Sequence, residues 1–173
     1  KREALCHDWN LPATVADMPQ RGYKVCGFPP PSSGAIAIGQ ILGILGSTPA
    51  ATMALSQDGL PTADWLHFYT EASRLAFADR ALYVADPDFV QAPGGNWLNL
   101  LDSRYLQERS RLIGQQSMKV AQPGNPTQFK VSHGPMPEQV EYGTSHISIV
   151  DAFGNALAMT TTIEAQFGSR QMV

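Results

Sequence analysis

Two threonines near the end of the chain, Thr144 and Thr162, are placed where their hydroxyl groups could act together in nucleophilic chemistry. A threonine hydroxyl is a weak nucleophile at its own pKa, so it needs a neighbouring group as base or guide. The stretches 145–150 and 156–163 are rich in Ile, Val, Leu, Met and Thr, and the intervening Asp151–Asn155 has the composition of a turn. This pattern predicts a β-hairpin.

The register of this hairpin decides which side chains meet. With a three-residue loop over 152–154, Asp151 pairs with Asn155, and the same register places Thr144 opposite Thr162. Threonines that face each other across strands can hydrogen-bond. Such pairs also occur in ordinary sheets, so the pairing alone does not identify a catalytic site.

Metal chemistry has less support in the sequence. Cys6 stands beside His7 without a second ligand at zinc spacing. His67 and Glu71 lie one helical turn apart, which is far more common for an exposed pair on an amphipathic helix than for a two-ligand site. Cys6 and Cys26 fit two free thiols and one disulfide equally well. No metal is therefore expected.

The elements that must position the hairpin are predicted to be mainly helical. The first residues are expected to form a polar loop, followed by a strand over 23–28 and helices over 35–45, 62–85 and 103–113. No charged side chain occurs from Val25 to Gln57, so the helix inside this stretch is expected to be largely buried. The polar stretch 115–141 contains four prolines and is expected to be a long, irregular and mobile loop.

Composition excludes several functional classes. The chain has 173 residues, of which 43% are hydrophobic and 16% charged, a globular rather than a disordered composition. Its formal charge of -3 without a basic cluster argues against nucleic acid as a partner. The longest apolar stretch, 34–46, is too short to span a membrane, and no signal peptide is visible. Neither end has a helix cap or turn, so a piece of a longer protein is expected.

Three blocks of residues, in the same order along the chain, resemble the γ-glutamyltranspeptidase family. They are Pro29-Pro30-Pro31-Ser32-Ser33-Gly34, then Glu71-Ala72-Ser73-Arg74-Leu75-Ala76-Phe77-Ala78-Asp79-Arg80 with Asp86-Pro87-Asp88-Phe89-Val90, and then Gly143-Thr144-Ser145-His146-Ile147-Ser148-Ile149-Val150-Asp151 with Gly154-Asn155-Ala156. The resemblance extends from about Tyr23 to Val173. It implies an α+β fold, the αββα sandwich of N-terminal-nucleophile hydrolases, present here in part.

The resemblance also implies a precursor that cuts itself between Gly143 and Thr144. Residues 1–143 would then end the large subunit, and 144–173 would begin the small subunit. The freed α-amino group of Thr144 titrates near neutrality and would serve as the base for its own hydroxyl. Thr162 matches the second family threonine, which orients that hydroxyl. Ser145 and His146 match positions beside the nucleophile, where we expect a supporting role, and no cofactor is required.

The implied substrate is a small γ-glutamyl or related amide, but one position departs from the family pattern. Glu164 stands where transpeptidases usually carry Asn, and a carboxylate there should repel the carboxylate of a γ-glutamyl donor. A cephalosporin-acylase-like amidohydrolase is therefore one alternative, and a non-catalytic module of the same fold is another.

The resemblance places further parts of the enzyme outside these residues. The family's oxyanion loop lies beyond Val173 and its carboxylate-binding Arg lies upstream, so the chain should be inactive without the rest of its precursor. The family favours a periplasmic or extracellular location, and a cytoplasmic one stays open.

Overall fold

Three helices form the framework of the first part of the chain. The computed structural model describes residues 4–10, 22–127 and 144–162. The chain divides into two compact units, Lys1–Met136 and Pro137–Val173. The helices of the first unit are α1 (Gly34–Gly46), α2 (Ala63–Tyr83) and α3 (Ser103–Ser110), with short 3₁₀ turns at Pro49–Thr52, Pro93–Gly95 and Trp97–Leu101.

Capping contacts confirm the predicted starts of α2 and α3, whereas the Ser33 side chain at the start of α1 makes no capping hydrogen bond. The Thr62 hydroxyl accepts a hydrogen bond from the Trp65 backbone N–H at 3.2 Å, which caps α2. Asp102 caps α3 by accepting from the N–H groups of Arg104 and Tyr105, both at 3.0 Å. α2 ends two residues before the predicted limit, and α3 ends three residues before it. Helix ends fray, so sequence patterns locate them less well than capped starts.

Two strands precede α1, whereas the sequence predicts only one. β1 (Leu5–Asn10) pairs antiparallel with β2 (Gly22–Gly27). The expectation of a polar loop at the start was therefore wrong. The composition of β1 mixes strand-forming and polar residues, so the strand depends on pairing with β2 more than on its own propensity.

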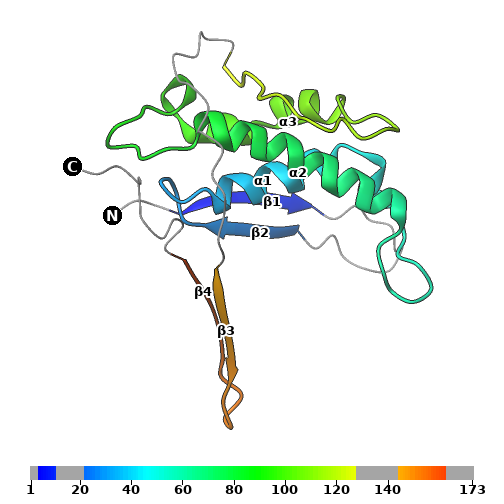
Figure 1. Ribbon diagram of the computed structural model, residues 1–173, viewed down its shortest axis with the longest axis vertical. Coiled ribbons are helices and arrows are strands. Elements are labelled where there is room, and N and C mark those ends of the chain that lie inside the picture. Colours follow the sequence, from blue (N-terminus) through cyan, green and yellow to red (C-terminus); the bar gives the residue numbers. More distant parts are fainter. Residues whose placement is uncertain (1–3, 11–21, 128–143, 163–173) are drawn as a thin grey trace. The chain divides into compact units, whose positions relative to one another are not determined.

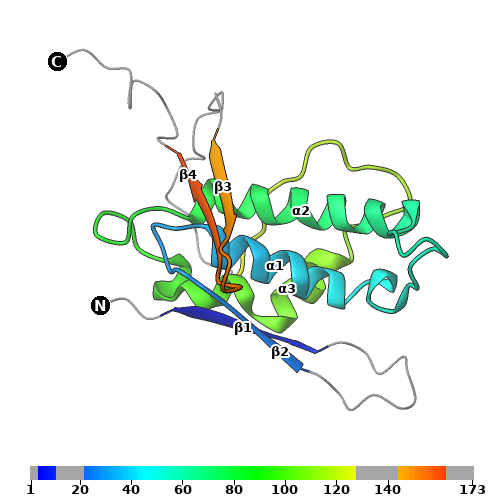
Figure 2. The same cartoon turned by 90° about the horizontal axis from the view of Figure 1, so that it is seen from below.

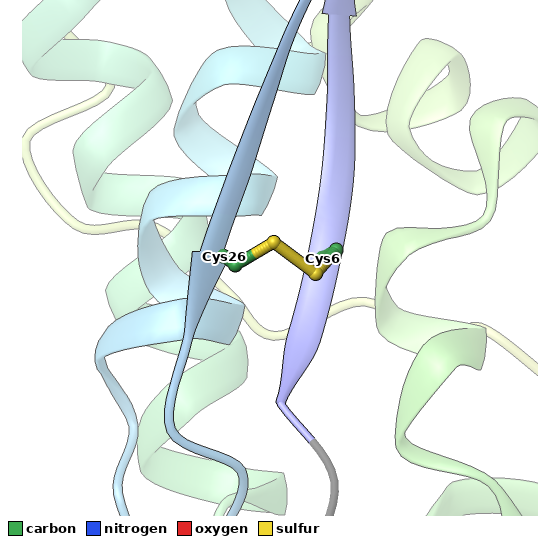
Figure 3. Close-up of a disulfide and its surroundings, with 2 residues drawn as sticks. All are labelled: Cys6 and Cys26. Carbon is green, nitrogen blue, oxygen red and sulfur yellow. A yellow bond between two sulfur atoms is a disulfide. The ribbon is translucent and has the colours of Figure 1, made fainter.

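A disulfide joins the two strands. Cys6 and Cys26 are directly opposite in the register, and their sulfur atoms are bonded (Figure 3). Of the two alternatives that the sequence left open, the structure has the disulfide. The Cys6 sulfur is consequently not available as a metal ligand.

α1 lies between α2 on one side and the β1–β2 pair on the other (Figures 1 and 2). It buries Ile36 and Ile44 completely, as expected for a helix inside a charge-free stretch. Ile38 points away from them and is 49% exposed, so one side of the helix remains open within the described residues. Other large apolar side chains that are fully buried in the described part of the chain include Leu75, Leu100 and Leu106.

A buried carboxylate lies at the centre of the helical unit. Asp79 on α2 is 0% exposed and accepts four hydrogen bonds. One oxygen takes Nε2 of Gln40 at 2.9 Å and the hydroxyl of Tyr105 at 2.7 Å. The other takes Nη2 of Arg109 at 3.0 Å and the backbone N–H of Gly124 at 2.7 Å. We call these five residues the Asp79 cluster.

The protonation of the cluster matches its hydrogen bonds. Burial raises the pKa of Tyr105, and the negative charge of Asp79 raises it further, so the phenol keeps the proton that it donates. Gln40 also donates through Nε2 to the Leu100 carbonyl at 3.1 Å, which fixes the orientation of its amide. A buried charge is tolerated only when it is paired and hydrogen-bonded, and the guanidinium of Arg109 supplies both.

The irregular segment after α3 is bonded along α2. We call residues 114–124 the strap; in Figure 2 this yellow-green segment follows α2. His67 Nε2 lies 2.7 Å from the Gly114 carbonyl, which can only accept, so this nitrogen carries the proton. Glu71 accepts from the Ser117 hydroxyl at 3.0 Å and from the Met118 N–H at 2.8 Å.

The far end of the strap is held as well. The Tyr83 hydroxyl donates to the Gly124 carbonyl at 2.5 Å, and Arg109 Nη2 donates to the Gln122 carbonyl at 2.8 Å. The prediction of irregular structure is therefore confirmed for the described part of this loop. Side chains of α2 and α3 bind the backbone of the strap, and the expectation that the loop is mobile stays a prediction.

The second unit contains the predicted hairpin. β3 (Ser145–Val150) pairs antiparallel with β4 (Ala156–Thr161), within two residues of the predicted ranges. Among the described helices of the chain, none is both long and apolar enough to cross a membrane.

We expect non-reducing peptide mapping of the full-length protein to give one cross-linked pair of peptides containing Cys6 and Cys26. Replacing both cysteines by serine should lower the free energy of unfolding by about 3 kcal/mol, the value typical of a loop of this size. Thermal unfolding with and without reductant measures this change. Alkylation of both cysteines before reduction would contradict the prediction.

Candidate active site

A tight turn sets the register of the hairpin. The Asp151 N–H donates to the Asn155 carbonyl at 3.0 Å, and the Gly154 N–H donates to the Asp151 carbonyl at 3.1 Å. Gly154 has φ +85°, a left-handed conformation that glycine adopts without steric cost. The structure thus confirms the predicted three-residue loop with Asp151 opposite Asn155.

The carboxylate of Asp151 holds this turn together. Its Oδ1 accepts from the backbone N–H groups of Phe153 and Asn155, both at 2.9 Å, and its Oδ2 accepts from the Asn155 side-chain amide at 2.7 Å. The Asn155 side chain, followed by the Asn155 backbone N–H, lowers the pKa of Asp151 because both bonds favour the charged form.

The ladder fixes the positions of the two candidate threonines. Ser145 pairs with Thr161 at the open end of the hairpin. Thr144 immediately precedes β3 and Thr162 immediately follows β4, so each occupies the position directly beyond this pair. Because side chains alternate along a strand, both positions belong to the face that carries His146.

His146 is held by two hydroxyl groups on that same face. Its Nδ1 lies 2.7 Å from Oγ1 of Thr160, its cross-strand partner, and its Nε2 lies 3.0 Å from Oγ of Ser148. With both ring nitrogens engaged, the imidazole has a fixed orientation. Ser145 occupies the opposite face by alternation.

The two faces of the hairpin differ in chemistry. The face of the candidate threonines carries Thr144, His146, Ser148, Thr160 and Thr162, together with Val150 and two alanines. The opposite face carries the large apolar Ile147, Ile149, Leu157 and Met159, with Ser145 and Thr161 at its open end. All described hairpin side chains are exposed, as expected for a two-stranded element that cannot bury either face alone.

The remaining candidate residues are either outside the described part of the chain or bonded within the helical unit. Gly143 and Glu164 lie outside the described residues. Glu71 is buried rather than exposed, and both it and His67 bind the strap, so the expected exposed pair was wrong. In the described ranges, no three His, Cys, Asp or Glu side chains gather as a metal site would need.

The Asp79 cluster is the polar centre that sequence reasoning missed. The one local signal on α2 is that Asp79 and the three residues that also bind the strap are spaced at multiples of four, namely His67, Glu71 and Tyr83. Their partners lie between 26 and 47 residues away along the chain. Spacing on one helix does not reveal partners that are so remote.

Comparison with known proteins gives a consistent family assignment. A family model described as Gamma-glutamyltranspeptidase matches residues 3–173. A glutathione hydrolase proenzyme of Pseudomonas aeruginosa is 38% identical over 172 residues, 99% of this chain and 26% of the relative. An Acylase ACY 1 proenzyme of Pseudomonas sp. strain V22 is 36% identical over 149 residues, 86% of this chain and 23% of the relative.

Solved structures agree with this assignment. The γ-glutamyltranspeptidase of Helicobacter pylori is similar with a TM-score of 0.54 and 28% identity, covering 76% of this chain and 33% of that structure. The chain spans about a quarter of the length of the curated relatives that it matches. Its helices and small antiparallel sheets are compatible with the N-terminal-nucleophile hydrolase fold of these neighbours.

The turn should weaken in acid. Since folding lowers the pKa of Asp151 from 3.8, its stabilising contribution is complete above that value and is lost as pH falls through the lower, folded pKa. NMR shifts of the Phe153 and Asn155 amides in the full-length protein should follow this titration, and Asp151→Asn should abolish it. The exposed Asp58→Asn is the matched control. A titration that persists in Asp151→Asn would contradict the assignment.

Proposed function

The chain belongs to the γ-glutamyltranspeptidase family, and from this premise we propose that Thr144 is the nucleophile of an acyl-transfer enzyme. The observation that carries the proposal is the hairpin register. It places Thr144 directly beyond Ser145↔Thr161, at the position opposite Thr162 and on the face of His146. A second hydroxyl at that position can hydrogen-bond to the nucleophile and orient it.

Maturation in this proposal is hydrolysis of the peptide bond between Gly143 and Thr144. Water adds across the bond, which leaves a carboxylate on Gly143 and an α-amino group on Thr144. Residues 1–143 then end a large subunit and residues 144–173 begin a small one. The relatives' names include the word proenzyme, which supports a precursor form.

The mature chemistry needs only groups of Thr144 for its proton transfers. The α-amine removes the proton from the hydroxyl, and Oγ attacks the carbonyl carbon of the amide substrate. The carbon–nitrogen bond breaks, the leaving amine takes the proton, and an ester with Oγ remains. Water or an acceptor amine then attacks this ester and restores the hydroxyl. No metal or organic cofactor enters these steps.

The proposed reaction depends on more than these 173 residues. Oxyanion donors commonly contribute two to three orders of magnitude each to acyl transfer. We place these donors and the contacts to the donor's carboxylate in the remainder of the precursor, as in the family, and the isolated chain is then inactive.

Changing Thr144 to Ala in the full-length protein should leave one uncut polypeptide without hydrolase activity, because the nucleophilic hydroxyl is lost and, in an uncut chain, the α-amine that serves as base is not freed. The wild type should give two polypeptides, the smaller one starting at Thr144. Intact mass and N-terminal sequencing measure this outcome. Thr144→Ser keeps a hydroxyl and should still cut. An uncut wild type would favour a non-catalytic module.

A second candidate function, an acylase on amides other than γ-glutamyl ones, is favoured by two observations. An acylase is among the relatives at 36% identity, and Glu164 places a carboxylate where the family usually has Asn. A full-length enzyme that releases product from a glutaryl amide and not from a γ-glutamyl anilide would be such an acylase.

If Glu164 faces the donor, Glu164→Asn should lower KM for a γ-glutamyl anilide. Removing a repulsion of roughly 1 kcal/mol corresponds to about a five-fold change. Steady-state kinetics on the full-length enzyme measure it, with a butyryl anilide, which carries no carboxylate, as the matched control substrate. An unchanged or raised KM for the γ-glutamyl donor would show that Glu164 does not face it.

A further inference from the structure

The imidazole of His146 leans toward the closed end of the hairpin, away from the candidate nucleophile. Its Nε2, at the far end of the ring, lies 3.0 Å from Oγ of Ser148, which is two residues nearer the turn. Its Nδ1 lies 2.7 Å from Oγ1 of Thr160 on the opposite strand. Thr144 lies two residues from His146 in the other direction, at the open end of the hairpin. We call the two hydroxyl groups of Ser148 and Thr160 the imidazole clamp.

The chemistry of the imidazole clamp suits a neutral ring in either tautomer. A hydroxyl can both donate and accept a hydrogen bond, so one hydroxyl donates to the bare ring nitrogen while the other accepts from the N–H. Thr160 is β-branched, which restricts the rotation of its hydroxyl about χ1. Ala158 is the residue opposite Ser148, and its short side chain occupies little space beside the ring. Side chains from both strands thus set the orientation of His146.

The spacing of the strand offers the ring a second partner. Ser148 and Thr144 are each two residues from His146 on the same face, which is a separation of about 6.6 Å in either direction. Side chains in strands lean along the strand in more than one common rotamer. A ring that reaches the Ser148 hydroxyl at 3.0 Å can therefore reach the Thr144 hydroxyl by rotation about χ1. In that orientation the imidazole would compete for the hydroxyl of the nucleophile.

We propose that the imidazole clamp holds His146 away from Thr144, so that the hydroxyl of the nucleophile stays available to its own α-amine and to Thr162. Ser148 and Thr160 are then positioning residues for acyl transfer. Neither of their hydroxyls belongs to a bond that forms or breaks, because both act through the orientation of the ring. This inference rests on the proposed function, since it concerns the same nucleophile.

The test measures self-cleavage and turnover of the full-length protein, with whichever of the γ-glutamyl anilide and the glutaryl amide the wild type cleaves. Ser148→Ala and Thr160→Val each remove one clamp hydroxyl. Each should lower the cleavage rate and kcat about five-fold, the effect of one competing hydrogen bond, and leave KM unchanged. Ser148→Thr keeps a hydroxyl and should keep kcat. Thr161→Val is the matched control, because it is the same substitution one residue away on the opposite face.

A double-mutant cycle separates the imidazole clamp from a general role in holding the hairpin. Thr160→Val should lower kcat when His146 is present and have no effect in a His146→Ala background, because the clamp acts only through the ring. An equal fall in both backgrounds would overturn the inference, and so would an unchanged kcat in both clamp variants. A complete loss of cleavage and turnover in His146→Ala alone would also overturn it, because the ring would then take part in the chemistry. A wild-type precursor that never cuts at Gly143–Thr144 would instead overturn the proposed function.

Discussion

The negatively charged carboxylate of Asp79 is fully buried, and the arrangement of the helical unit depends on the groups that compensate this charge. Its four donors come from α1, from two positions on α3 and from the strap. Removing one partner from such a pair leaves an uncompensated buried charge, which typically costs 3–5 kcal/mol. Each donor is therefore needed in its place when the unit folds, and this requirement includes Gly124 of the strap as well as the helices.

Local sequence signals were sufficient to predict the helix starts and the hairpin turn, because neighbouring residues specify these features. Thr62 and Asp102 predicted the starts of α2 and α3 because a side-chain oxygen satisfies N–H groups that the helix leaves unpaired. Asp151 and Gly154 predicted the turn and, through it, the register of β3 and β4. In each case the partners lie within four residues of one another, so the pattern contains the whole interaction.

Interactions between residues far apart in the sequence could not be predicted from local patterns. β1 is specified by pairing with β2 across a long connection, and its own residues give little indication of a strand. The charge-free stretch that contains α1 was read as apolar, yet Gln40 within it is fully buried and binds both Asp79 and the Leu100 carbonyl. The sequence around a single polar residue in an apolar helix does not show its partners. For Gln40 they lie 39 and 60 residues further along the chain.

Because the turn at Asp151 fixes one end of β3, the face that Thr144 occupies depends on whether the number of residues between them is odd or even. Side chains alternate along β3, so the number of residues between Asp151 and Thr144 decides which face Thr144 occupies. One residue inserted into β3 would move Thr144 to the face of Ile147, whereas two would restore the face and shift only the distance along it. With the turn unchanged, insertions into β3 therefore keep Thr144 on its face only when they come in pairs of residues.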